Sequence, residues 1–204
     1  SIGNVSFYNE TEGIKINPTP AVGVIGVEDI ENIRTLDFKN EGDKILLIGK
    51  TYDELTGSEY HRCIHNLEKG TAPRIRIEEE VANGQTVLDL ISNDKDKNIT
   101  AVHDVSAGGL AVALSEMVIK SGLGCDVELV DDELDKIQLL YSDSHARYLL
   151  TVRAEAVDDI LSQISVPVQV IGEVKGTSLN VNGHEFSYDD LNDAYHGVIE
   201  KYMM

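Results

Sequence analysis

The chain has 204 residues, with 17 Lys and Arg against 36 Asp and Glu and a formal net charge of −19 at pH 7. A surface this acidic repels nucleic acid and anionic membranes, which excludes both as partners. There are two cysteines, no signal peptide and no apolar run near the ~18 residues of a membrane-spanning helix, so the sequence indicates a cytoplasmic, reducing location. Any phosphate ligand must then be held by backbone N–H groups, a few basic side chains, or divalent cations that bridge carboxylates to phosphate.

The first 40 residues are predicted to belong to a different domain from the rest. Residues 3–10 alternate polar and apolar side chains, as a strand with one wet face does, and the pattern begins so close to Ser1 that we expect a fragment or an engineered start. Residues 21–28 are predicted to form a buried strand. The polar connector that follows, up to residue 40, contains the expected domain boundary.

Residues 41–204 are predicted to form one α/β domain, a mixed sheet with flanking helices. Strand and helix patterns alternate irregularly, and Asn182-Gly183 is a strong hairpin signal, which favours a mixed sheet over a doubly wound parallel one. The predicted strands are 44–48, 99–102, 125–130, 148–152, 168–174, 177–181 and 184–186. The predicted helices are one carrying 61–65, then 78–91, one between 106 and 122, 131–140, 154–164, and a last one that begins after 187.

The stretch from Ile99 to Gly122 contains one strand, one glycine loop and one helix. Ser106 is the expected N-cap of the helix and Gly122 its expected end. In this arrangement backbone N–H groups and the positive end of the helix dipole would face an anion such as phosphate. The pattern matches neither the P-loop nor the dinucleotide fingerprint, and a Gly-Gly pair before a helix can equally serve only to pack the helix on its strand.

Two further patterns give no site. His103, Asp104 and Ser106 lie on adjacent links of one turn and cannot adopt the geometry of a Ser-His-Asp triad. His61 and His65 have the four-residue spacing of two metal ligands on a helix, but no third ligand follows in register.

Three stretches occur in a fixed order along the chain. They are Gly-Asn-Val-Ser-Phe-Tyr-Asn-Glu (3–10) with Pro-Thr-Pro-Ala-Val-Gly-Val-Ile-Gly (18–26), Thr-Gly-Ser-Glu-Tyr (56–60), and His-Asp-Val-Ser-Ala-Gly-Gly-Leu-Ala-Val-Ala-Leu-Ser-Glu-Met (103–117). Together they resemble the C-terminal part of the large (synthetase) subunit of phosphoribosylformylglycinamidine synthase, over essentially the whole chain. The resemblance implies a C-terminal domain like that of aminoimidazole ribonucleotide synthetase at 41–204, preceded at 1–40 by the last part of an ATP-binding domain.

The resemblance implies a role in purine biosynthesis. ATP activates the formamide oxygen of formylglycinamide ribonucleotide, and ammonia from glutamine displaces phosphate to give the amidine. ATP and Mg²⁺ are the implied cofactors, and the implied protein partners are the N-terminal half of the same protein, a glutaminase subunit and a small accessory subunit. The resemblance implies that the complete protein carries two repeats of a unit like aminoimidazole ribonucleotide synthetase, of which this chain is the end of the second. The catalytic His and the Mg²⁺ carboxylates of the first repeat are missing, so we expect no catalytic residue and no activity from this chain alone.

The family's Gly-Asn-x-Ser element falls on Gly3, Asn4 and Ser6. The resemblance implies that Gly3 contacts ATP, that Asn4 ligates Mg²⁺ and that Ser6 contacts the ribonucleotide substrate. An Asn oxygen is a suitable neutral ligand for Mg²⁺, and a glycine lets phosphate approach the backbone.

The resemblance also implies a phosphate or nucleotide loop, because the corresponding loop of the first repeat carries a metal-binding Asp. Its residues here are Asp104, Ser106, Gly108 and Gly109. Farther along, relatives often have Ser-Glu-Ser where this chain has Ser-Asp-Ser, so Asp143 is one methylene shorter than the usual side chain.

Two other functions remain open at this stage. One is a kinase-like relative of the same superfamily that phosphorylates an oxygen of another small substrate, although the motif at 3–10 argues against it. The other is a non-catalytic scaffold whose apolar sheet face docks on partner subunits. A chain that dimerises but binds no nucleotide would favour the scaffold.

Overall fold

The computed structural model describes residues 10–15, 23–67 and 69–203. The chain divides into two compact units, Ser1–Glu31 and Asn32–Met204. This division lies before the domain boundary predicted at residue 40, which stays a prediction. The described elements at the N-terminal end are two short antiparallel strands and a 3₁₀ helix: β1 (Glu10–Thr11), β2 (Ile14–Lys15) and η1 (Ile30–Asn32).

The buried strand predicted at 21–28 is wrong where the structure describes it. Residues 23–29 form no regular secondary structure, and Val24, Ile25 and Val27 are 91%, 93% and 95% exposed. A buried strand needs hydrogen-bonded neighbours for its backbone, and the described part of the chain provides none for this segment. Residues 21 and 22, and the strand predicted at 3–10 except for its last residue, lie outside the described residues.

The second unit is built on a seven-stranded sheet with the order β4-β6-β3-β7-β5-β8-β9. All neighbouring strands are antiparallel except β5 and β8, which are parallel, so the predicted mixed sheet is confirmed. Asn182 and Gly183 turn the chain between β8 and β9 with φ of 49° and 80°, the left-handed values that a two-residue hairpin needs. The strands are β3 (Lys44–Ile48), β4 (Ile99–Asp104), β5 (Cys125–Val127), β6 (Tyr148–Val152), β7 (Val168–Val174), β8 (Leu179–Val181) and β9 (His184–Phe186).

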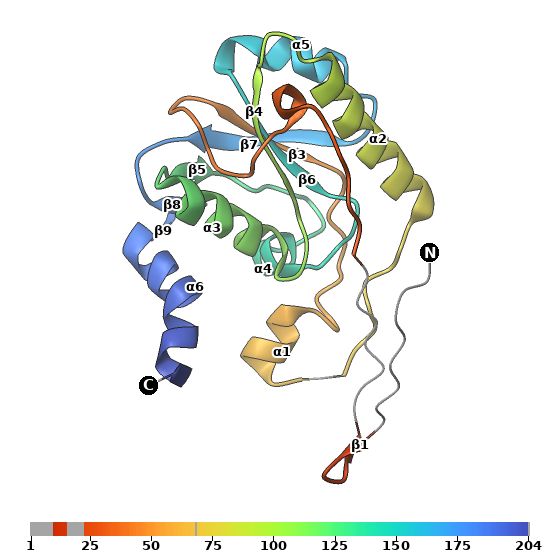
Figure 1. Cartoon of the computed structure of the whole chain (residues 1–204), viewed down its shortest axis with the longest axis vertical. Coiled ribbons are helices and arrows are strands. Elements are labelled where there is room, and N and C mark those ends of the chain that lie inside the picture. The colour runs from red at the N-terminus through yellow and green to blue at the C-terminus, as the bar shows by residue number, and fades with distance from the viewer. Residues whose placement is uncertain (1–9, 16–22, 68, 204) are drawn as a thin grey trace. The chain divides into compact units, whose positions relative to one another are not determined.

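Six α-helices in the described part of the second unit accompany this sheet (Figure 1). No helix in the described part of the chain is both long and apolar enough to cross a membrane. The helices are α1 (Glu59–His65), α2 (Ile77–Asn93), α3 (Gly109–Ser121), α4 (Lys136–Tyr141), α5 (Val157–Ser162), which follows the 3₁₀ helix η2 (Ala154–Ala156), and α6 (Tyr188–Met203).

Several predicted boundaries differ from the structure, and for two of them the hydrogen bonds show a local reason. The carboxylate of Asp131 accepts the N–H groups of Glu133 and Leu134 in a turn, and α4 begins only after Asp135, which forms a capping box with Gln138. Strand β5 ends at Val127 instead of Val130. Beyond it, the Leu129 N–H donates to the Asn182 side chain (3.2 Å) and leaves the ladder of the sheet.

Helices pack on both faces of the sheet. Because alternate residues of a strand point to opposite faces, one strand contributes side chains to a core on each face. On β3, Ile45 and Leu47 belong to a core shared with α3 and α4, whereas Leu46 and Ile48 belong to a second core shared with α2 and α5. In Figure 1, α2 and α5 accordingly lie on the opposite side of the sheet from α3 and α4.

The two cysteines are expected to differ in reactivity. Cys125 on β5 is fully buried, and burial together with the charge of Asp126 raises the pKa of its thiol to about 12, whereas Cys63 on α1 is exposed. Because the thiolate is the nucleophile, only Cys63 should react with a disulfide reagent in the native protein at about pH 8, and both should react after unfolding. Counting the thiols that react before and after addition of urea checks this. Two rapidly reacting thiols in the native protein would contradict it.

Candidate functional site

Two loops that the sequence singles out meet in one pocket of about 400 Å³. Residues 104–107, at the end of β4, form one wall, and residues 143–147, just before β6, form another. Strands β4 and β6 are antiparallel neighbours in which Asp104 pairs with Tyr148, so the end of one strand lies beside the start of the other. Glu80 of α2 lines the pocket as well.

The predicted phosphate-loop residues are placed unequally around this pocket. Asp104, whose side chain is 68% exposed, and Ser106 line it, whereas Gly108 and Gly109 are not among its lining residues. Ser106 is not the N-cap of α3, as the sequence predicted. The cap is Gly108 with φ of 89°, and the Ser106 carbonyl accepts the Gly109 N–H at 3.0 Å. The helix therefore starts after a left-handed turn that a glycine adopts without strain.

A carboxylate of the chain itself occupies the start of α3. Asp143 accepts the Gly108 N–H with Oδ1 at 2.9 Å and the N–H of Glu59, the first residue of α1, with Oδ2 at 3.1 Å. Partial burial raises the pKa of the Asp143 carboxyl, although the two backbone N–H groups act in the opposite direction. The N–H predicted to face a phosphate therefore already has an acceptor. No sequence pattern indicates this contact, because Gly108 and Asp143 are 35 residues apart.

Arg147 organises the second loop from inside. The residue is 1% exposed, and its guanidinium donates to the carbonyls of Ser142 (2.6 Å) and Ser144 (3.0 Å) and to the hydroxyl of Thr51 (3.0 Å). Burial lowers the pKa of this guanidinium to about 10, although the negative charge of nearby Asp143 opposes the shift. Arg147 therefore fixes the path of residues 142–147, a role that sequence reasoning missed.

The same loop is tied to two other segments. The hydroxyl of Ser144 accepts the Tyr52 N–H at 3.0 Å, and the Ala146 carbonyl accepts the side-chain amide of Asn83 on α2 at 2.8 Å. Ala146 has a φ of 58°, and a Cβ added to Gly49 would lie 2.3 Å from its carbonyl oxygen. Gly49 thus allows the close approach of the two backbones that places this wall of the pocket.

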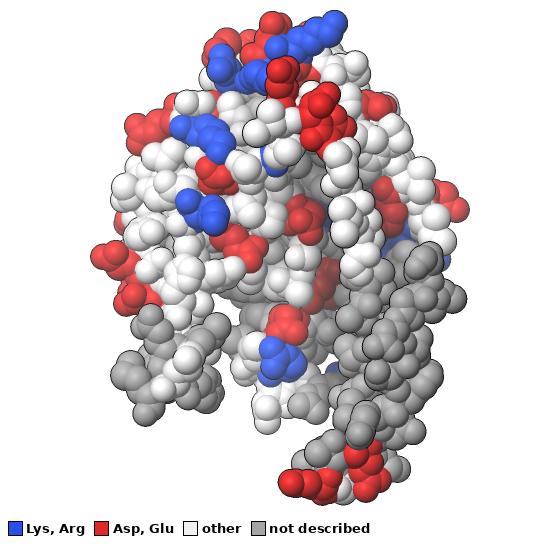
Figure 2. Space-filling view, viewed as in Figure 1, with Lys and Arg blue, Asp and Glu red and all other residues white. Residues whose placement is uncertain are grey.

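The pocket is acidic. Glu80, Asp104 and Asp143 line it, against His145, whose Nδ1 lies 3.7 Å from a Glu80 oxygen, and the buried Arg147. Acidic side chains are also spread over the face of the molecule drawn in Figure 2. Within the described ranges, no group of three or more His, Cys, Asp or Glu side chains could hold a metal ion, and His61 and His65 contact each other edge to face without a third ligand. A phosphate in this pocket would therefore need a cation that it brings with it.

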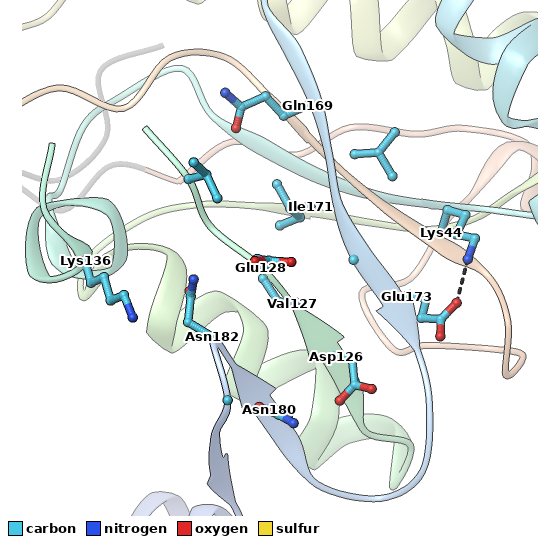
Figure 3. Close-up of a pocket in the computed structure, with 14 residues that line it drawn as sticks. Lys44, Asp126, Val127, Glu128, Lys136, Gln169, Ile171, Glu173, Asn180 and Asn182 are labelled. Carbon is cyan, nitrogen blue, oxygen red and sulfur yellow. Dashed lines mark hydrogen bonds and ion pairs between the residues drawn. The ribbon is translucent and has the colours of Figure 1, made fainter. Parts of the chain in front are cut away.

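A larger hollow lies elsewhere and contains none of the predicted residues. It is an open trough of about 1060 Å³ whose floor is formed by β5, β7 and β8 (Figure 3). Lys44 and Glu173, at one end, form an ion pair of 2.5 Å, and Asp126 and Lys136 line it farther along. The smaller pocket is the candidate site, although it has less volume, because residues of the predicted phosphate loop line it.

Gly3, Asn4 and Ser6 lie outside the described residues. Their predicted roles in binding ATP, Mg²⁺ and substrate stay predictions.

Comparisons with known proteins agree with this fold. Residues 40–182 match the family model of the AIR synthase related protein, C-terminal domain. The chain is 70% identical over 205 residues to the phosphoribosylformylglycinamidine synthase subunit PurL of Methanobrevibacter smithii, which covers 98% of this chain and 29% of that protein. It is 46% identical over 204 residues to the PurL of Methanothermobacter thermautotrophicus, covering 98% of this chain and 28% of that protein. The chain thus spans less than a third of the length of these relatives.

Among solved structures, a Thermotoga maritima PurL complexed with FGAR has a TM-score of 0.67 at 18% identity, covering 80% of this chain and 30% of that one. The hydrogenase maturation protein HypE of E. coli has a TM-score of 0.51 at 16% identity, covering 76% of this chain and 51% of that one. Likeness at such identities concerns the fold, and it confirms the predicted mixed sheet of the aminoimidazole ribonucleotide synthetase type. The chain therefore belongs to the family of AIR synthase related proteins, whose C-terminal domain it carries.

Proposed function

We propose that this chain is the C-terminal part of a PurL subunit, which converts formylglycinamide ribonucleotide to formylglycinamidine ribonucleotide with ATP and glutamine. The observation that carries the proposal is the 70% identity to a PurL over 98% of the chain. Because the chain spans 29% of that relative, the residues that complete the active site would lie in the rest of a PurL-length protein, and the chain alone would be inactive. The complete protein would then be an ATP-dependent C–N ligase of purine biosynthesis that works in the cytoplasm.

Residues 1–40 would be the last part of the ATP-binding domain, with Gly3 against ATP, Asn4 on Mg²⁺ and Ser6 against the ribonucleotide. The exposure of Val24, Ile25 and Val27 supports this proposal. Three of the four residues 24–27 are apolar, and burying such side chains is favourable. The rest of an ATP-binding domain would provide the surface that buries them.

The pocket between residues 104–107 and 143–147 would hold the phosphates of a nucleotide, with Asp104, Ser106, Gly108 and Gly109 as its loop. The Gly108 N–H already donates to Asp143 and is not free to bind phosphate. We therefore infer that the phosphate would bind through a Mg²⁺ ion, which the exposed Asp104 carboxylate would help to ligate. A T. maritima PurL solved with ATP supports nucleotide binding by this type of protein. A structure of PurLQS from the same organism supports assembly with partner subunits, which we propose to be a glutaminase and a small accessory subunit.

Calorimetric titration of the chain with ADP, with and without Mg²⁺, tests the nucleotide pocket. We expect saturable binding that depends on Mg²⁺ and weakens by about tenfold or more in Asp104→Asn, since each tenfold corresponds to about 1.4 kcal/mol. Glu128→Gln, a carboxylate of the separate trough, is the matched control and should bind as the parent does. Absence of binding, or equal binding by Asp104→Asn, would overturn this assignment.

The Asn4→Ala variant tests the assignment of the magnesium ligand in the complete enzyme. Loss of a neutral oxygen ligand should misplace Mg²⁺·ATP and lower kcat/KM by about tenfold or more. Steady-state kinetics at varied ATP and Mg²⁺ measure this effect, with Asn9→Ala as the control from the same stretch but outside the Gly-Asn-x-Ser element. Normal kinetics in Asn4→Ala would sink the assignment.

A further inference from the structure

The outer side of α2 exposes a line of apolar side chains. Ile77, Val81 and Leu88 are 67%, 65% and 55% exposed, although they belong to a regular helix. Their spacing of four and seven residues places them within about 40° of one another around the helix and over about 17 Å along it. The residues of α2 that face the core are different ones, Asn83, Val87 and Leu90. Helix α2 therefore has a second apolar side, here called the α2 stripe.

The α2 stripe is bordered by carboxylates. Helix α2 contains Glu78, Glu79, Glu80 and Asp89 and no Lys or Arg. By helical spacing, Glu78 and Asp89 lie on one flank of the stripe and Glu80 on the other. An exposed apolar surface bordered by charged side chains is typical of a protein–protein interaction site.

We propose that the α2 stripe binds an amphipathic helix of a partner protein, whose apolar side is flanked by Lys or Arg. A straight apolar line of about three turns matches the repeat of a second helix packed along α2. The flanking carboxylates would pair with basic residues of the partner and exclude an acidic one. A second copy of this chain fits poorly, because α2 against α2 would bring Glu78 and Asp89 close to the same carboxylates of the other copy. The proposal involves no nucleotide and stands apart from the proposed function.

Fluorescence anisotropy on the full chain tests the proposal. The probe is a labelled synthetic helical peptide of about 18 residues, with Leu at the positions that would face the stripe and Lys beside them. We expect saturable binding that weakens as salt is raised, because the flanking charges are exposed to solvent. Val81→Ser combined with Leu88→Ser should weaken it at least about tenfold, and so should replacing each Lys of the peptide by Glu.

Ile64→Ser on α1 is the matched control, since Ile64 is also a helical apolar residue, 65% exposed, and lies outside the α2 stripe. It should leave the affinity unchanged, and circular dichroism should show that both variants keep the parental melting temperature. Equal binding of the Lys and Glu peptides, or parental affinity in the double variant, would overturn the proposal. So would sedimentation showing that the chain dimerises and that the double variant abolishes the dimer.

Discussion

Replacing Arg147 by Met is expected to lower the free energy of unfolding by about 3–5 kcal/mol. The change removes three buried donors and leaves the carbonyls of Ser142 and Ser144 and the hydroxyl of Thr51 without them. Each buried acceptor without a partner costs about 1–3 kcal/mol, and only part is regained by no longer burying a charge. Since a typical domain is stable by about 5–15 kcal/mol, this is a large fraction of the total.

Urea unfolding followed by circular dichroism measures the loss as a lower midpoint at an unchanged m-value. Arg147→Lys is the informative control: it keeps the positive charge but cannot reach three acceptors at once, so we expect an intermediate loss. A loss in Arg147→Met below about 1 kcal/mol, the net contribution of one hydrogen bond, would contradict the role assigned to this guanidinium.

Replacing Asp94 by Ala is expected to cost a similar amount, about 3–5 kcal/mol. The Asp94 carboxylate follows α2 and accepts the N–H groups of Asn98 (2.8 Å) and Ile99 (2.9 Å) and the Arg34 guanidinium (3.1 Å). The side chains of Arg34 and Asp94 are 6% and 2% exposed, so water cannot replace the lost carboxylate. Arg34 also donates to the Ile99 carbonyl at 2.9 Å, which joins the segment before β3 to the edge strand β4.

A double-mutant cycle separates the ion pair from the two backbone hydrogen bonds of Asp94. In the Arg34→Met background, Asp94→Ala should cost less than in the parent, because no buried guanidinium then loses its carboxylate. Equal costs in both backgrounds would show that Arg34 and Asp94 do not interact energetically, contrary to the 3.1 Å contact.

The strands were predictable where an apolar run ends at turn residues. The bounds predicted for β3, β6, β7 and β9 agree with the structure, and the Asn182-Gly183 hairpin is present. The segment at 23–28 is also rich in apolar residues, as the strands are, but composition cannot indicate whether a neighbouring strand exists to pair with it. Capping decides the start of α4, where two acidic residues, Asp131 and Asp135, compete for the same role.

The pocket was predictable only in part. The sequence identified both loops that line it, since Asp104 and Ser106 stand at the end of an apolar strand and Asp143 in a polar loop before another. It did not indicate that the two loops meet, because this depends on the pairing of β4 with β6. Nor could it show that Arg147 folds inward, since an arginine in a polar loop is ordinarily exposed.

A chimeric enzyme tests the proposed function most directly. In the M. smithii PurL, the 205-residue stretch that aligns with this chain at 70% identity would be replaced by this chain, and product formation from formylglycinamide ribonucleotide, ATP and glutamine would be measured with that enzyme's own partner subunits. We expect a kcat/KM within about tenfold of the parent, a difference of about 1.4 kcal/mol in the barrier. A chimera that folds and assembles as the parent does but forms no product would contradict the assignment of this chain to that enzyme.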